Sequence, residues 1–212
     1  MGLFLDSAKI EEVKRAVELG FLAGVTTNPT IMAEASGAPR DIIRQICAVS
    51  PGPVFHQVTA KTAADREREG REFSAISPEK VVLKIPATTE NMVLMAKLSR
   101  DIPCAATAVY SGHQTLVACE AGARYVIPYV NRATRLLGDG YRLVAEMAAV
   151  LKASGKAAEI LAASIKSAEE ATQAVLAGAN HLTLPLDILL SLGNHPLSDA
   201  AIGEFGRAGQ AN

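Results

Sequence analysis

The sequence contains the stretch Val81-Val82-Leu83-Lys84-Ile85-Pro86, an apolar run broken by a single lysine. Short apolar runs of about four to eight residues, rich in β-branched side chains, are typical of buried strands. A helical pattern follows from about Glu90 to Ser99, and a second apolar run occupies Cys104–Val109. This order predicts two parallel strands joined by a crossover helix.

The same alternation continues toward both ends of the chain. Further strands are predicted over Leu3–Leu5, Leu22–Val25, Val54–Val58, Tyr125–Val130, Glu159–Ser164 and His181–Leu184. Helices are predicted between them over Lys9–Leu19, Asp41–Val49, Ala63–Ser74, Gly112–Ala121, Gly140–Ala153 and Ala168–Leu176. About eight strand–helix units in 212 residues favour an α/β fold of the closed (β/α)8 TIM-barrel type. A doubly wound open sheet is the runner-up, but it normally carries a GxGxxG turn, which this sequence lacks.

No linker or change of composition divides the chain. We therefore expect one domain over residues 1–212, with the barrel at about 2–190 and a helical tail at about 198–212. The tail is a weak helix former, because Gly203, Gly206 and Gly209 each cost about 1 kcal/mol relative to alanine in a helix interior.

The composition indicates a globular protein and argues against two classes of partner. Hydrophobic residues make up 49% and charged residues 20%, and the net charge is −1. The absence of a basic excess argues against nucleic acid and anionic membranes as partners. Aromatic residues are only 4%, which disfavours base stacking, and no apolar run reaches the ~20 residues of a membrane helix.

The cysteines and histidines give no sign of a metal site. Cys47, Cys104 and Cys119 are scattered, and the four histidines share no ligand spacing. Because this spacing is unsuited to a metal, we expect a protein without a metal or other cofactor. Reduced thiols, together with an amino terminus without the features of a signal peptide, lead us to expect a cytoplasmic location.

Polar side chains stand at the carboxyl ends of the predicted strands, where barrels carry their active sites. The set comprises Asp6, Thr26, Asn28, Gln57, Lys84, Thr107, Tyr129, Arg132, Ser164, Lys166 and Thr183. Polar groups that converge above an apolar barrel suit a small hydroxylated substrate.

Lys84 is the most informative of these residues. An ammonium group among apolar side chains is poorly solvated, so its pKa falls and the neutral amine becomes accessible. A neutral amine attacks ketones and forms a Schiff base. The alternative is an ordinary lysine at a strand end that extends to solvent.

Ordinary structural explanations also exist for other members of the set. Asp6 is equally explained as a cap of the helix near Lys9, and Ser164 as a helix N-cap. Tyr129 fits a core position and Arg132 an exposed cation. Asn28 before a proline fits a turn.

Several motifs resemble those of the transaldolase family, in its small branch that consists of the barrel alone. The first signature corresponds to Gly24–Met32, and the second, which carries the Schiff-base lysine, to Val81–Pro86 with Thr88 and Glu90. The similarity extends to Tyr125–Arg132, Leu161–Ser164 and Thr183–Leu186 and covers nearly the whole chain. The resemblance therefore implies a TIM barrel that acts on sugar phosphates through Lys84.

This branch contains transaldolases, which transfer a dihydroxyacetone unit, and fructose-6-phosphate aldolases, which release it. The transaldolases carry glutamate at the position of Gln57 and usually phenylalanine at that of Tyr129. Since this chain has glutamine and tyrosine there, the resemblance implies an aldolase, with a transaldolase as the alternative. A catalytically silent barrel that binds a sugar phosphate is a more distant possibility.

The resemblance also implies a role for each site residue. Tyr129, Gln57 and Thr107 hold a water that relays protons, and no metal is needed because the iminium takes the place of a Lewis acid. Asp6, which is counted among the catalytic residues, and Asn28 hydrogen-bond hydroxyls of the donor half, and Thr26 is a further substrate-binding residue. Arg132 and Ser164 hold the phosphate.

Two positions depart from the aldolase pattern. Ile127 stands where the aldolases have alanine, and it has the same strand parity as Tyr129, so it is expected to narrow the donor pocket. Asn91 replaces a glycine of the second signature. Family members form pentamers and paired pentamers, which implies a homo-oligomer here.

Overall fold

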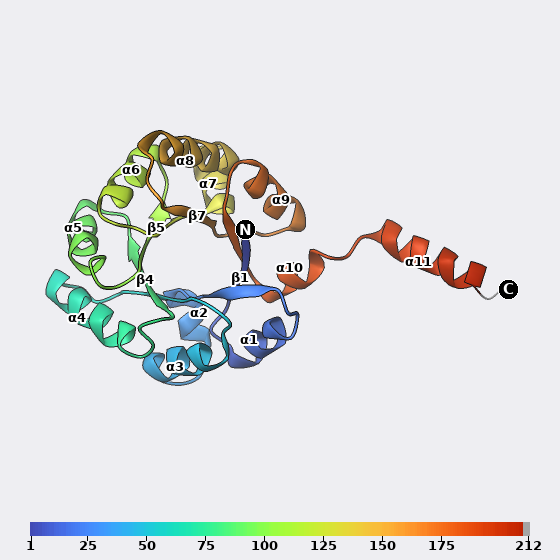
Figure 1. Cartoon of the computed structure of the whole chain (residues 1–212), viewed down its shortest axis with the longest axis horizontal. Coiled ribbons are helices and arrows are strands. Elements are labelled where there is room, and N and C mark those ends of the chain that lie inside the picture. The colour runs from blue at the N-terminus through green and yellow to red at the C-terminus, as the bar shows by residue number, and fades with distance from the viewer. Residues whose placement is uncertain (210–212) are drawn as a thin grey trace.

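The computed structural model of the protein, which describes residues 1–209, is a closed barrel of eight parallel strands in chain order (Figure 1). The strands are β1 (Gly2–Asp6), β2 (Leu22–Thr26), β3 (Val54–Gln57), β4 (Val81–Pro86), β5 (Cys104–Val109), β6 (Tyr125–Pro128), β7 (Glu159–Ala162) and β8 (His181–Leu184). Closure comes from the pairing of β1 with both β2 and β8. The predicted TIM-barrel fold is confirmed.

Helices follow the strands, and all but the last lie around the barrel (Figure 1). They are α1 (Ile10–Val17), α2 (Pro29–Glu34), α3 (Pro39–Val49), α4 (Ala63–Ser74), α5 (Thr89–Leu98), α6 (Gly112–Glu120), α7 (Val130–Leu137), α8 (Gly140–Ser154), α9 (Ala168–Leu176), α10 (Leu186–Ser191) and α11 (Pro196–Gly209). Within residues 1–209, no helix combines the length and apolar character needed to cross a bilayer.

Three short helices, α2, α7 and α10, were not predicted. Each begins directly after a barrel strand and has only six to eight residues, too few to show a clear helical period. The predicted strand Tyr125–Val130 was too long for this reason: β6 ends at Pro128, and Val130 begins α7. These helices lie at the carboxyl ends of β2, β6 and β8.

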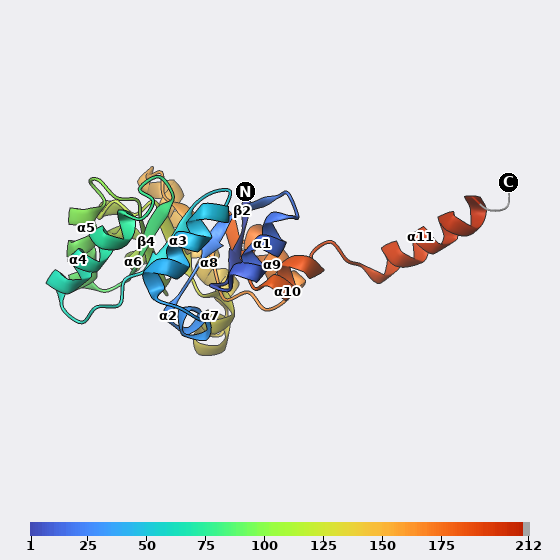
Figure 2. The same cartoon turned by 90° about the horizontal axis from the view of Figure 1, so that it is seen from below.

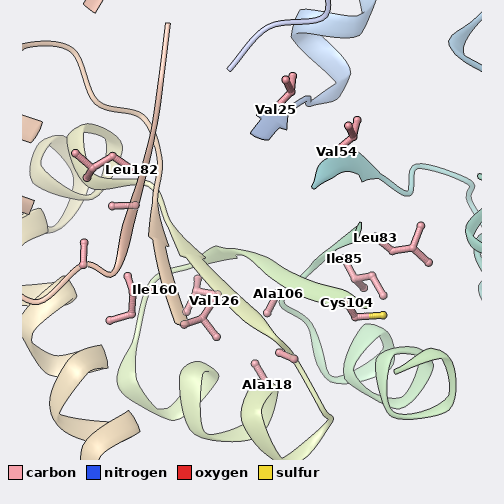
Figure 3. Packing of buried hydrophobic residues seen from close by; sticks show 14 of the residues in the cluster. Val25, Val54, Leu83, Ile85, Cys104, Ala106, Ala118, Val126, Ile160 and Leu182 are labelled. Carbon is pink, nitrogen blue, oxygen red and sulfur yellow. The ribbon is translucent and has the colours of Figure 1, made fainter. Parts of the chain in front are cut away.

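The outward side chains of the strands form the larger core, packed beneath the helices. Figure 3 shows part of it, with Val25, Leu83 and Val126 from three different strands. The alternation of strand side chains sends the remaining residues into the barrel.

The barrel interior has its own, smaller cluster. It consists of Phe4, Phe55, Val82, Ala105, Tyr125, Ile127, Leu161 and Ala163. Phe55 makes edge-on contacts with the rings of Phe4 and Tyr125, at centroid distances of 5.8 and 5.1 Å. This packed layer forms a floor below the carboxyl ends of the strands.

The last helix, α11, stands away from the barrel (Figures 1 and 2). It starts at Pro196, and its exposed apolar side chains include Leu197, Ile202 and Phe205. A helix in the predicted tail is therefore present, and the predicted end at 210–212 lies outside the described residues.

Gly140→Ala is expected to destabilise the barrel by about 1–3 kcal/mol. A Cβ at Gly140 would overlap the backbone carbonyl of Val130 and lie 2.7 Å from Thr134 Oγ1, so α7 and α8 would have to separate. Urea unfolding measures the change. Gly206→Ala is the control, because a Cβ there would have no described atom within 4 Å, and its urea midpoint should be unchanged or higher.

Candidate active site

A cavity of about 890 Å³ opens at the carboxyl ends of the strands. Its wall includes eight of the predicted strand-end residues, namely Asp6, Asn28, Gln57, Lys84, Tyr129, Arg132, Ser164 and Lys166. Residues from the strands and from the segments that follow them thus meet around one space, as the strand-end argument predicted.

Lys84 lies at the base of this cavity. Its side chain is 3% exposed, and Nζ donates a hydrogen bond of 2.8 Å to the carbonyl oxygen of Thr27. Burial lowers the pKa of Lys84, and the nearby Asp6 carboxyl opposes that shift. The interpretation of Lys84 as a lysine that extends to solvent is therefore wrong, and burial shifts the titration of the amine toward the neutral form.

Asp6 belongs to a hydrogen-bonded chain across three strands. Its Oδ1 accepts a bond of 2.7 Å from Thr26 Oγ1, which lies 2.6 Å from Thr183 Oγ1. Burial raises the pKa of Asp6, while Lys84, Thr26 and Lys166 lower it. The interpretation of Asp6 as a helix cap is wrong, because Lys9 occupies the N-cap of α1 and, among the described residues, no side chain caps that helix.

Thr26 has a different place from the one predicted for a substrate-binding residue. It is fully buried beneath Asp6 and is absent from the cavity wall. Its contact is with the carboxyl group of Asp6, which it orients.

Tyr129 and Thr107 form a hydroxyl pair, with Oγ1 and OH 3.0 Å apart. The Arg132 guanidinium lies over the Tyr129 ring, 4.8 Å from its centroid. Burial raises the pKa of Tyr129, although Thr107 and Arg132 lower it, so the phenol remains a proton donor at neutral pH. Tyr129 is therefore partly a packing residue, yet it presents its hydroxyl near the cavity floor.

Gln57 is the neighbour of Lys84 in the sheet, paired with it in the register of β3 and β4. Its Oε1 is buried and accepts no hydrogen bond within the described part of the chain. A buried acceptor without a partner is costly, so this atom is poised for a water or a substrate hydroxyl.

Asn28 begins α2, and its Oδ1 accepts a bond of 3.1 Å from the backbone nitrogen of Ile31. Its ordinary structural role is thus a helix cap, and it lines the cavity as well.

Ser164 is not a helix cap, so the interpretation of this residue as an N-cap is wrong. Ser167 caps α9 by accepting from the Glu170 nitrogen at 3.1 Å. Ser164 itself adopts a left-handed conformation with φ of 60°, and Ala108, next to Thr107, has φ of 55°. Such conformations cost about 1–3 kcal/mol in residues other than glycine and cluster at functional sites.

Ile127 lies one layer below Tyr129. It is fully buried in the interior cluster and is absent from the cavity wall, so its predicted influence on the donor pocket stays a prediction. Thr107, which is also fully buried, reaches the site through Tyr129.

Several residues of the wall come from helices and were missed from the sequence. Lys9, Glu12 and Arg15 belong to α1 or its N-cap, and Glu34 ends α2. On an amphipathic helix such charges look like any solvated face, so no local signal marked them. No cluster of three or more His, Cys, Asp or Glu side chains suited to a metal ion occurs among residues 1–209.

The lowered pKa of Lys84 leads to a prediction about pH. Only the neutral amine attacks a ketone, so imine formation should speed up as pH rises through this pKa, and the rise should be complete at a lower pH than for an ordinary lysine. The rate of borohydride trapping, measured from about pH 6 to about pH 10, checks this expectation. A trapping rate that still increases in the pH range where an ordinary lysine loses its proton would contradict this expectation.

The fold and the cavity define an α/β-barrel protein with a polar site around a buried lysine. The family described as "Transaldolase/Fructose-6-phosphate aldolase" matches residues 3–211 of the chain. The chain belongs to this family. It is therefore an enzyme of the aldolase and transaldolase kind, with sugar phosphates as its class of substrate.

Individual relatives agree with the family. A "Probable transaldolase" of Moorella thermoacetica is 37% identical over 206 residues, which cover 97% of this chain and 95% of that protein. One from Dehalococcoides mccartyi is 38% identical, with coverages of 97% and 96%. The solved structure of a mandelate oxidase mutant with an FMN adduct shares the fold alone, with a TM-score of 0.62, 15% identity and coverages of 90% and 66%.

Proposed function

We propose that the protein is a Schiff-base aldolase that cleaves fructose 6-phosphate to dihydroxyacetone and glyceraldehyde 3-phosphate and catalyses the reverse reaction. The observation that carries this proposal is the Lys84 amine, buried at the base of a polar cavity with its pKa lowered by burial.

In the first stage, Nζ of Lys84 attacks the C2 carbonyl carbon of the ketose. The carbinolamine loses water and becomes an iminium ion. A base removes the proton of the C4 hydroxyl, the C3–C4 bond breaks, and its electron pair passes to the iminium, which becomes an enamine. Glyceraldehyde 3-phosphate is the first product.

In the second stage, C3 of the enamine takes up a proton and the iminium is formed again. Water adds to C2, the C–N bond breaks, and dihydroxyacetone and the free amine result. A water bound by Gln57 Oε1 and the hydroxyl pair of Tyr129 and Thr107 supports both the proton transfers and this hydrolysis.

Four other residues of the cavity wall hold the substrate. Arg132 and Ser164 bind the phosphate through charge-assisted hydrogen bonds. Asp6 and Asn28 bind hydroxyls of the donor half, and the Asp6 carboxylate favours the iminium electrostatically once it forms.

A transaldolase is the second candidate, and the printed names of the relatives favour it. The two activities share every step up to the enamine. In a transaldolase, an acceptor aldehyde then takes the place of the proton, and the C–C bond formed carries the dihydroxyacetone unit to a new sugar.

The two candidates are separated by incubating fructose 6-phosphate with and without erythrose 4-phosphate. We expect glyceraldehyde 3-phosphate and free dihydroxyacetone without the acceptor. Product that appears only with erythrose 4-phosphate would overturn the aldolase and establish the transaldolase. Reduction with borohydride in the presence of fructose 6-phosphate, followed by peptide mass spectrometry, tests the shared chemistry: a silent barrel would show no added mass on Lys84.

We further propose a homo-oligomer, a pentamer or a decamer. The exposed Leu197, Ile202 and Phe205 on α11 support this assembly, since apolar side chains on a projecting helix favour contact with another copy. Native mass spectrometry measures it, and a monomer would contradict it.

A further inference from the structure

We propose that Glu69 of α4 is a positioning residue that holds Gln57 in place for the delivery of water to the imine. This inference rests on the proposed function, because it concerns the water that distinguishes release from transfer. Glu69 lies outside the cavity wall around Lys84, so its action is through the backbone that carries Gln57.

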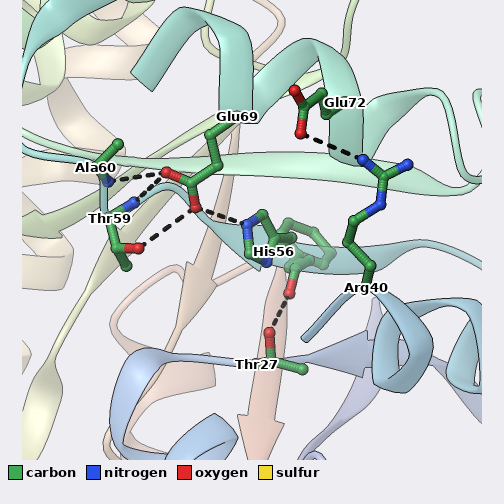
Figure 4. Close-up of polar contacts among 8 residues, drawn as sticks. Thr27, Arg40, His56, Thr59, Ala60, Glu69 and Glu72 are labelled. Carbon is green, nitrogen blue, oxygen red and sulfur yellow. Dashed lines mark hydrogen bonds and ion pairs between the residues drawn. The ribbon is translucent and has the colours of Figure 1, made fainter. Parts of the chain in front are cut away.

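The Glu69 carboxylate accepts hydrogen bonds from the chain just after Gln57. One oxygen, Oε2, accepts bonds of 2.9 and 2.8 Å from the backbone nitrogens of Thr59 and Ala60 (Figure 4). The other oxygen, Oε1, lies 3.3 Å from the hydroxyl of Thr59. The backbone on the carboxyl side of Gln57 is thus fixed to α4.

The same carboxylate also fixes the residue just before Gln57. Nε2 of His56 lies 3.1 Å from Glu69 Oε1, and their side chains are 6% and 16% exposed. The His56 ring stacks on Phe73 of α4 with centroids 3.6 Å apart and planes at 6°. One helix therefore holds the chain on both sides of Gln57.

Glu69 is suited to this role because it remains ionised. Although burial alone raises the pKa of its carboxyl, the bonds from His56, Thr59 and Ala60 hold that pKa below its usual range. Charge-assisted bonds to backbone N–H groups are stronger than neutral ones. A stiff strand end is what Gln57 needs, since its Oε1 has no partner among residues 1–209 that would fix its direction.

A second cavity of about 600 Å³ lies behind Gln57. Gln57 and Asn28 line both this cavity and the one around Lys84, and Glu69 lines only the second. This space leaves room for the Gln57 side chain to turn away from Lys84. The pairing of β3 with β4 holds the backbone on one side, through the bond of 3.0 Å from Val58 N to Lys84 O, and Glu69 holds it on the other.

The test compares Glu69→Ala, Glu69→Gln and Glu72→Ala in the assay with and without acceptor. Glu69→Ala removes every bond described above, and we expect dihydroxyacetone release to fall about tenfold or more, because small errors of position are costly in catalysis. Transfer to erythrose 4-phosphate should fall less, because it does not need the hydrolytic water. The ratio of release to transfer therefore falls.

Glu69→Gln is the conservative variant. Its carbonyl oxygen can still accept from Thr59 and Ala60 while its NH₂ faces His56, so the ratio should stay within about threefold of the wild type. Glu72→Ala removes the exposed pair with Arg40 from the same helix and should leave the ratio unchanged.

An unchanged ratio in Glu69→Ala would overturn the inference, as would a loss in Glu69→Gln as large as that in Glu69→Ala. If Glu69→Ala does not fold, His56→Phe decides, because it keeps a ring on Phe73 and removes the contact with Glu69; an unchanged ratio there overturns the inference. Borohydride trapping of Lys84 is measured in the wild type and in every variant. If the wild type shows no trapping, the proposed Schiff-base function itself fails, and this result is distinct from a failure of the inference about Glu69.

Discussion

Lys84→Met is expected to lower kcat/KM for fructose 6-phosphate by at least about a thousandfold, since Lys9 and Lys166, the other lysines of the cavity wall, are exposed rather than buried. The fold should survive, because methionine is an unbranched chain of similar length and the position of Lys84 is already buried. Thr27 loses one hydrogen bond to its carbonyl oxygen, at about 1 kcal/mol, but a buried amine is removed with it.

Steady-state assays, thermal unfolding and borohydride trapping together check this expectation. Lys80→Met is the matched control: Lys80 directly precedes β4 and donates bonds of 2.8 and 2.9 Å to the carbonyl oxygens of Cys47 and Ser50. Its loss should reduce stability and leave kcat close to that of the wild type. Turnover in Lys84→Met comparable to that of the wild type would refute the role of the lysine.

Tyr129→Phe should reduce the release of dihydroxyacetone by about a hundredfold, the usual effect of losing a proton-transfer group. The ring stays in place beneath Arg132, and only the hydroxyl that pairs with Thr107 is lost. Because transfer does not require hydrolysis of the imine, it should decline less, and the variant should become more like a transaldolase.

The measurement is the ratio of release to transfer with erythrose 4-phosphate as acceptor. Tyr110→Phe provides the control, because its ring packs edge-on against Tyr129, at 6.2 Å, and loses only its own hydroxyl. Equal loss of both activities in Tyr129→Phe would assign the hydroxyl to a step common to the two routes and contradict its role in hydrolysis.

The barrel strands could be predicted because strands of a parallel sheet are buried on both faces and stand out as continuous apolar runs. Lys84 was visible for the same reason, as the one charge in such a run. The short α2, α7 and α10 could not be found in this way, since helices of about two turns leave no period to detect.

Contacts between distant segments explain what else was missed. Thr26 and Thr183 are 157 positions apart, and only closure of the barrel brings their hydroxyls together beneath Asp6. Glu69 belongs to the helix Ala63–Ser74, whose many charges indicate a solvated surface. The chain alone gives no reason to single it out, because its role depends on the fold of the neighbouring loop.

The aromatic floor made by Phe4, Phe55 and Tyr125 determines where substrates and products can enter and leave the site. Because the barrel interior is packed below the lysine, the cavity is open only at the carboxyl face. Substrates and products therefore enter and leave at the same face. In the proposed reaction, the product aldehyde must leave through the same opening of the cavity by which an acceptor aldehyde would enter. In the proposed mechanism, release and transfer are then competing outcomes at one opening, decided by whether water reaches the imine or an acceptor sugar reaches the enamine.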